Sequence, residues 1–276
     1  MQTYSTINLG WCPDVPDFRD RSSPQLHIKA GHYVDLREPR FESSCPEIGH
    51  SMHASCAQSI IAMLDWQNKK WKGEGVEASI AFLHGLTVRL VGGGGRQGIG
   101  IRSCIKTLVQ FGAPPEHLWP STEQNFTAPC SPELYGFARH FQSLVYFRLD
   151  GWMHDSVSRL DAMRGHLFCG NPFLIGFAVP ATVFAAEQNL ISFDPAIGNT
   201  IGGSVAVVMG YDNNFQLPYK IQNRSVDQPN RSKGAFLVRT CWGSRWGDNG
   251  FGWLPYAFVD TRFAHDAWAI THTDWV

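Results

Sequence analysis

The sequence lacks the features that identify membrane, secreted and nucleic-acid-binding proteins. No apolar run approaches the roughly 20 residues that a membrane-spanning helix needs. The first ten residues, MQTYSTINLG, contain no basic segment followed by an apolar one, so we expect no secretory signal. Basic residues form no run, and 23 Lys and Arg balance 24 Asp and Glu. We therefore expect neither membrane insertion nor a nucleic-acid partner.

Cysteine pairs are also missing, although the chain has seven cysteines. None forms a CxxC motif, and no Cys/His cluster has the spacing of a zinc site. Without a secretory signal, the default is reduced thiols in a cytosol-like compartment. We expect no metal and no other cofactor.

The 276 residues are 43% hydrophobic and 17% charged, which suits one compact protein with two subdomains that share an interface. Apolar residues at helical spacing occur in the first half, and short β-branched and aromatic runs follow residue 145. The pattern predicts an α+β protein with segregated elements. Helices are expected near 55–66, 78–90, 101–111, 132–144 and 157–166, and strands within 144–152, 171–179, 204–212 and 234–242.

The expected organisation has three parts. Residues 1–32, which include WCPDVPDFRDRSSP, are interpreted as an irregular leading arm, with Trp11 and Phe18 lying across the surface of the body. Residues 33–145 would form a helical subdomain, in which YVDLRE is a possible short strand. Residues 146–276 would form a β subdomain with a twisted antiparallel sheet or barrel.

One residue of the helical half has chemical interest. Cys56 follows Ser55, a candidate N-cap, at the start of an apolar helix behind a Gly-containing loop. The positive end of a helix lowers a thiol pKa, and its free N–H groups can hold an oxyanion. A cysteine in an apolar helix is, however, more often a core residue than a nucleophile.

Several motifs resemble the papain-like cysteine peptidases, in particular their compact microbial and viral-type members. The similar segments run collinearly from about residue 9 to 262: LGWCPDVPDFRD, CPEIGHSMHASCAQS, GNPFLIGFAV, GGSVAVVMGYDNN and VRTCWGSRWGDNGFGWLPYAFV. The last contains WGxxWGxxGxGxxP and is the most specific. The resemblance implies the papain-like two-subdomain fold, with a helical left half and an antiparallel β-barrel-like right half.

The catalytic residues of the family are only partly present. The resemblance places the nucleophile at Cys56, the oxyanion-hole Gln position at His50, the general-base His position at Ser204 and the orienting Asn position at Thr240. Trp242 and Trp246 would pack behind the site, along the substrate groove. Three of the four catalytic positions therefore carry a different residue.

A shifted alignment does not restore the base, because no histidine occurs between His166 and His265. A serine hydroxyl neither titrates near pH 7 nor forms the ion pair that keeps a thiolate charged. Where nucleophile and base act as a unit, loss of one costs on the order of 10⁶-fold in turnover. The sequence therefore predicts that Cys56 lacks the imidazole that activates the nucleophile in this family, because Ser204 occupies the position of that histidine.

Three functions can be considered for this site. The first is an inactive peptidase homologue that serves as a binding or structural module, for instance in a viral particle. The second is an active cysteine peptidase that uses Cys56 with a non-standard base, His50, with His53 three residues from Cys56 in the same loop. The third, an acyl transferase, needs the same activated thiol and fails for the same reason. We expect a protein or peptide partner, such as other subunits of an assembly, in the cytoplasm or a virion.

Overall fold

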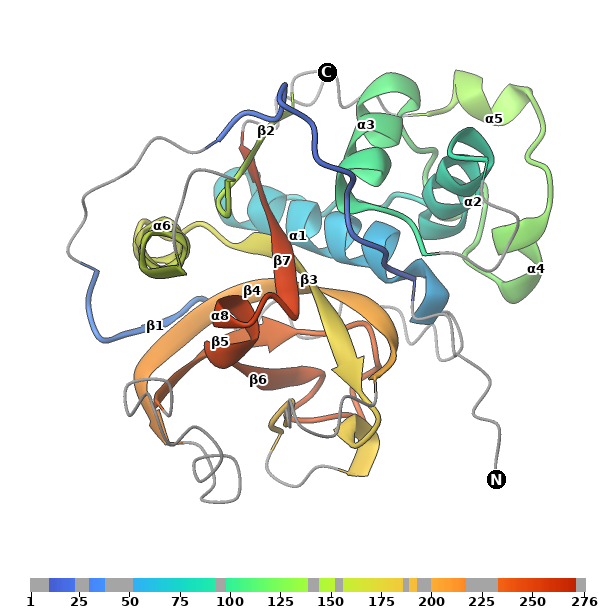
Figure 1. Cartoon of the computed structure of the whole chain (residues 1–276). Helices are drawn as coiled ribbons and strands as arrows, with labels where there is room; N and C mark the ends of the chain where they lie inside the picture. Colours follow the sequence, from blue (N-terminus) through green and yellow to red (C-terminus); the bar gives the residue numbers. More distant parts are fainter. Residues whose placement is uncertain are drawn as a thin grey trace.

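The computed structural model places helices on one side of the molecule and a sheet on the other (Figure 1). It describes residues 10–22, 30–37, 52–92, 98–138, 144–151, 156–185, 189–192, 200–216 and 233–271. The helical side contains α1 (Ser55–Lys72), α2 (Ile80–Leu90), α3 (Ile101–Phe111), α4 (Glu123–Thr127) and α5 (Glu133–Gly136), preceded by the 3₁₀ turn η2 (Met52–Ala54).

Helix α1 lies at the centre and packs against both the sheet and the other helices. Nearly all of its residues up to Asn68 are buried, and it ends at Gly73, whose φ of 76° suits a left-handed C-cap. The prediction that Ser55 is the N-cap is wrong. Ala54 occupies that position, and the Ser55 hydroxyl instead accepts a hydrogen bond from the Val205 amide at 3.3 Å, which ties α1 to the sheet.

The sheet of the described residues has seven antiparallel strands in the order β2-β7-β3-β4-β5-β6, with β1 paired to β4. The strands are β1 (Tyr33–Asp35), β2 (Val145–Arg148), β3 (Phe173–Pro180), β4 (Thr200–Gln216), β5 (Lys233–Arg239), β6 (Phe251–Pro255) and β7 (Ala264–Thr271). The fold is α+β, as predicted. β1 belongs to the sheet although its residues lie in the range assigned to the helical subdomain, and residue 145, the expected boundary, begins β2.

Two apolar cores cover the two faces of the sheet, and β4 contributes to both. Val205, Val207 and Met209 pack with the helical half, whereas Ala206 and Val208 belong to the second core. Because successive side chains of a strand point to opposite faces, a strand between two cores is apolar throughout. α6 (Ser156–Phe168) and α8 (Ala257–Asp260) stand on the second side.

Two other expectations need correction. The helix expected over 132–144 is only the short α5 in the described residues. The arm does not lie wholly on the surface: Phe18 is 97% exposed, but Trp11 is buried in the first core. In Figure 1 the arm runs as a blue trace across the front of the molecule, beside β7 and over α1.

Candidate functional site

Cys56 lies in the first turn of α1, at the junction of the helical half with the sheet. Its side chain is fully buried, and its thiol donates a hydrogen bond to the Ile99 carbonyl oxygen at 3.1 Å. Burial raises the pKa of the Cys56 thiol well above its ordinary value, and nearby cysteine and aspartate groups raise this pKa further. Desolvation therefore outweighs the helix terminus, and the neutral thiol is the stable form.

The position expected to hold the general base is equally enclosed. Ser204 lies in β4 opposite Phe177 of β3, and its buried hydroxyl is 3.8 Å from the Sγ of Cys241. Thr240, at the end of β5, donates its hydroxyl to the Gly250 carbonyl at 3.2 Å. Both hydroxyl groups thus have polar neighbours within the β half of the protein.

The histidines of the described residues have other partners. The His53 ring contacts the rings of His84 and Phe126, and burial lowers its pKa. The His265 ring contacts Trp11, with 5.0 Å between ring centroids. Among the described residues, no histidine forms a hydrogen bond or ion pair with Cys56 or Ser204. His50 lies outside the described residues, so its role remains a prediction.

His166 and His265 are the two histidines that border the stretch of sequence without histidine. His166 packs between the rings of Phe147 and Phe173 on the second side of the sheet. Burial lowers the pKa of His166 to about 4. Its ring is therefore a neutral member of the apolar core.

The leading arm passes between the segment before α3 and the start of β4. The Trp11 amide donates to the Gly203 carbonyl at 3.0 Å, and the Ile99 amide donates to the Gly10 carbonyl at 3.0 Å. The Cys12 amide donates to the Ile99 carbonyl at 3.4 Å, so it shares one acceptor with the Cys56 thiol. The arm therefore occupies the space beside the nucleophile position as a strand-like segment.

The two tryptophans expected along the groove lie together. The rings of Trp242 and Trp246 form an edge contact with centroids 4.6 Å apart. Phe177 and Phe184 each add an edge contact to Trp242, at 5.9 and 5.6 Å. This aromatic cluster packs next to the end of β5 and gives a structural reason for the WGxxWG motif that is independent of catalysis.

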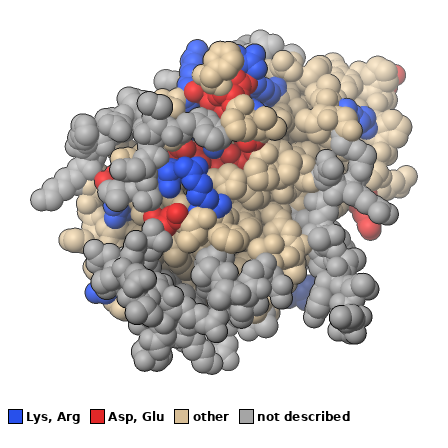
Figure 2. Space-filling view, in the orientation of Figure 1, with Lys and Arg blue, Asp and Glu red and all other residues tan. Residues whose placement is uncertain are grey.

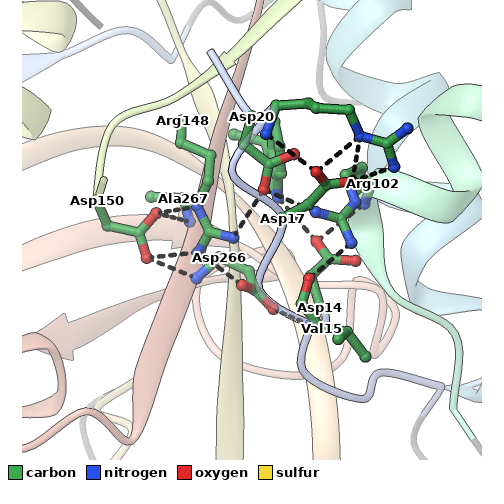
Figure 3. A network of polar contacts seen from close by, with 11 residues as sticks. Asp14, Val15, Asp17, Asp20, Arg102, Arg148, Asp150, Asp266 and Ala267 are labelled. Carbon is green, nitrogen blue, oxygen red and sulfur yellow. Dashed lines mark hydrogen bonds and ion pairs between the residues drawn. The ribbon is translucent and has the colours of Figure 1, made fainter. Parts of the chain in front are cut away.

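A buried charge network fastens the rest of the arm (Figure 3). The Arg148 guanidinium contacts Asp266 at 2.8 Å and Asp150 at 3.2 Å. The Arg102 guanidinium contacts the arm residue Asp20 at 2.7 Å. These charged groups are nearly inaccessible to water, so each needs its ion-pair partners to compensate for the hydration that it loses.

On the face shown in Figure 2, acidic and basic side chains lie side by side. No helix of the described residues is both long and apolar enough to cross a membrane. The described residues also contain no group of three metal-binding side chains.

The comparisons with known proteins agree with this architecture. No family model matches the chain. The peptidase C1-like protein L477 of Acanthamoeba polyphaga mimivirus is 26% identical over 178 residues, which are 63% of this chain and 51% of that protein. Xylellain, a cysteine protease from Xylella fastidiosa, superimposes with a TM-score of 0.75 at 21% identity and 98% coverage of both chains. The chain has the papain-like fold of these cysteine proteases.

A second structural neighbour supports the same fold. The procathepsin B from Trypanosoma congolense has a TM-score of 0.64 at 17% identity, over 98% of this chain and 88% of its own. At these identities the likeness to solved structures establishes the fold alone. The chain spans about half the length of the viral relative, so activity, substrates and partners have to be argued from the site.

Sequence reasoning missed the residues that hold the arm. Trp11 was expected on the surface, and Asp14 was not singled out. The Pro-rich segment around Trp11 and Asp14 has no helical or strand periodicity, so its pattern does not assign either residue to a core. The available signal was the glycines at 98, 176 and 203, which leave room for a close approach of another backbone.

Proposed function

We propose that this chain is a non-catalytic member of the papain-like fold, in which the cleft between the two halves serves as a peptide-binding groove. The observation that supports this most strongly is the state of Cys56. Its thiol is fully buried, is neutral because burial raises its pKa, and donates to the Ile99 carbonyl, and no histidine of the described residues bonds to it. A thiol in this state is a poor nucleophile.

The binding role is supported by the arm segment that lies between the segment before α3 and the start of β4. The Gly10–Cys12 segment forms backbone hydrogen bonds with Ile99 on one side and Gly203 on the other. Addition of an extended segment to exposed backbone groups is a general mode of peptide recognition. The scaffold thus supplies a peptide site without supplying hydrolysis, and this suits a binding or assembly component.

The alternative is a peptidase in which His50 activates Cys56. A thiol-directed vinyl sulfone or epoxide probe, together with a broad peptide library at pH 5 to 9, tests the two functions. We expect no cleavage, and labelling of Cys56 only after the protein is denatured, which shows that the thiol is intact. Rapid labelling of native Cys56 with peptide cleavage, both lost in His50→Ala, would establish the peptidase instead.

A further inference from the structure

The arm contacts the proposed groove at three positions that have a fixed spacing in the sequence. Gly10 enters the cleft, Trp11 fills a slot between two strands, and Asp14 reaches the first turn of α3. We infer that the cleft is a recognition site for extended peptides with the pattern Gly-Trp-x-x-Asp, and that Gly10–Asp14 is its intramolecular ligand. The inference rests on the proposed function and specifies the ligand of the groove.

The first position requires glycine. Gly10 has a φ of 92°, which lies in the left-handed region that other residues rarely adopt. A Cβ atom at Gly10 would lie 2.1 Å from the carbonyl oxygen of His53, which belongs to the turn before α1. Since that atom is backbone, it cannot move aside as a flexible side chain would. Any larger residue here would displace the segment.

The second position requires a flat aromatic group. A Cβ atom on Gly176 would lie 2.1 Å from Cε2 of the Trp11 indole, and one on Gly203 would lie 2.6 Å from its Cε3. The indole therefore rests directly on the backbone of β3 and β4, and the His265 ring meets it edge-on. Two neighbouring strands without side chains at these points form a slot that fits an indole.

The third position favours the carboxyl group of an aspartate. One Asp14 oxygen accepts hydrogen bonds from the Arg102 amide at 3.1 Å and from the Trp268 indole N–H at 2.9 Å. Gly100 is the N-cap of α3 and has no side chain that could accept a hydrogen bond from the first turn of the helix. A Cβ atom at Gly100 would lie 2.1 Å from the other Asp14 oxygen. The arm thus supplies the missing cap.

These contacts are all non-covalent, so a separate peptide of the same pattern can make them once the arm is weakened. In the intact protein the arm competes at an effective concentration of order millimolar. Binding in trans should therefore be measured on the full chain carrying Trp11→Ala. This change removes the indole and leaves the slot in place.

The experiment uses a fluorescein-labelled peptide of residues 7–16 with serine in place of the cysteine, followed by fluorescence anisotropy. We expect Trp11→Ala protein to bind it, with the wild-type chain at least about tenfold weaker. A peptide with alanine at the tryptophan position should bind at least about 30-fold more weakly, which is typical of a dominant contact residue. Alanine at the aspartate position should weaken binding about tenfold.

A pair of glycine variants provides the matched control. In Trp11→Ala protein, Gly176→Val fills the slot and should abolish selection for tryptophan. Gly136→Val should leave binding unchanged, because a Cβ at Gly136 meets no atom within 4 Å. Unfolding curves of both double variants verify that each is folded.

The outcomes separate the two proposals. Binding without dependence on tryptophan would leave a peptide groove but overturn the recognition pattern. Absence of binding to folded Trp11→Ala protein would overturn both the pattern and the groove. Tryptophan-dependent binding followed by cleavage would support the pattern and overturn the non-catalytic function.

Discussion

The Ser204 hydroxyl lies 3.8 Å from the Sγ of Cys241, and both side chains are buried. Two small groups therefore occupy the enclosed position predicted for the general base, where an imidazole would be larger than the serine that it replaces.

Restoring the base alone should fail for this reason. Ser204→His places a larger ring in a filled core, which typically costs about 1–3 kcal/mol of unfolding free energy, and Thr240 offers no amide to orient the ring. We expect lower stability in chemical denaturation and no peptide cleavage. Ser204→Ala should stay within about 1 kcal/mol of wild type, because the contact with Cys241 is weak. Peptidase activity in Ser204→His would show that only the base is missing.

Cys56 should become accessible when the arm is loosened. In Trp11→Ala protein we expect iodoacetamide to modify Cys56 at least about tenfold faster than in wild type, since the arm and the thiol share the Ile99 carbonyl. The raised pKa of Cys56 predicts a rate that still increases above pH 9. Mass spectrometry gives both rates, with the exposed Cys169 as internal reference. Fast modification of Cys56 in the wild-type chain at pH 7 would contradict the buried thiol.

Docking of the arm should weaken as pH rises. Burial, and then the neighbouring Asp266, raises the pKa of Asp14 from 3.8 to about 6, although Arg102 lowers it in part. The docked arm therefore keeps the Asp14 proton at a pH at which the free arm has released it. The free energy of docking becomes less favourable by up to about 3 kcal/mol as the pH rises from 4 to 6.

Hydrogen exchange of the Trp11 amide measures this dependence directly. After correction for intrinsic exchange, its protection should be greater at pH 5 than at pH 7.5. Asp14→Asn, which keeps a capping side chain without the charge, should remove most of the difference. An unchanged pH dependence in Asp14→Asn would assign the effect to other groups.

Global stability should show the opposite sign because of buried histidines. Burial, and then the nearby His53, lowers the pKa of His84 from 6.5 to about 3. Its contribution is complete above pH 6.5 and is lost as pH falls, by about 2 kcal/mol at pH 5. Denaturation at pH 7.5 and pH 5 should show a smaller difference in His84→Phe than in wild type, with His166 responsible for the remainder. Equal differences in the two proteins would exclude His84 as the source.

The sequence predicted the fold well because its signals are local and periodic. The apolar spacing of 101–111 matches α3 residue for residue, and the continuous apolar run of β4 follows from two cores on opposite faces. The catalytic positions assigned to Cys56, Ser204 and Thr240 remain predictions. The path of the arm was not predictable in this way, because Trp11 and Asp14 are held by partners up to 254 residues away in sequence.

Arg148 is the group on which the network beside the arm depends most. Its guanidinium is buried between Asp150 and Asp266, and it also lies over the Trp268 ring at 5.2 Å. Arg148→Met removes the cation and leaves buried carboxylates uncompensated, which typically costs about 3–5 kcal/mol. We expect this loss in urea denaturation, together with loss of protection at the Trp11 amide.

Arg19→Met is the matched control, because Arg19 also contacts an arm carboxylate, Asp17, at 2.7 Å, but its side chain is 72% exposed. An exposed pair of this kind contributes no more than about 1 kcal/mol. The two variants remove the same charge from the same region, so a difference between them measures burial and not net charge. Equal and small losses in both would show that the carboxylates around Arg148 take up protons or water without disturbing the arm.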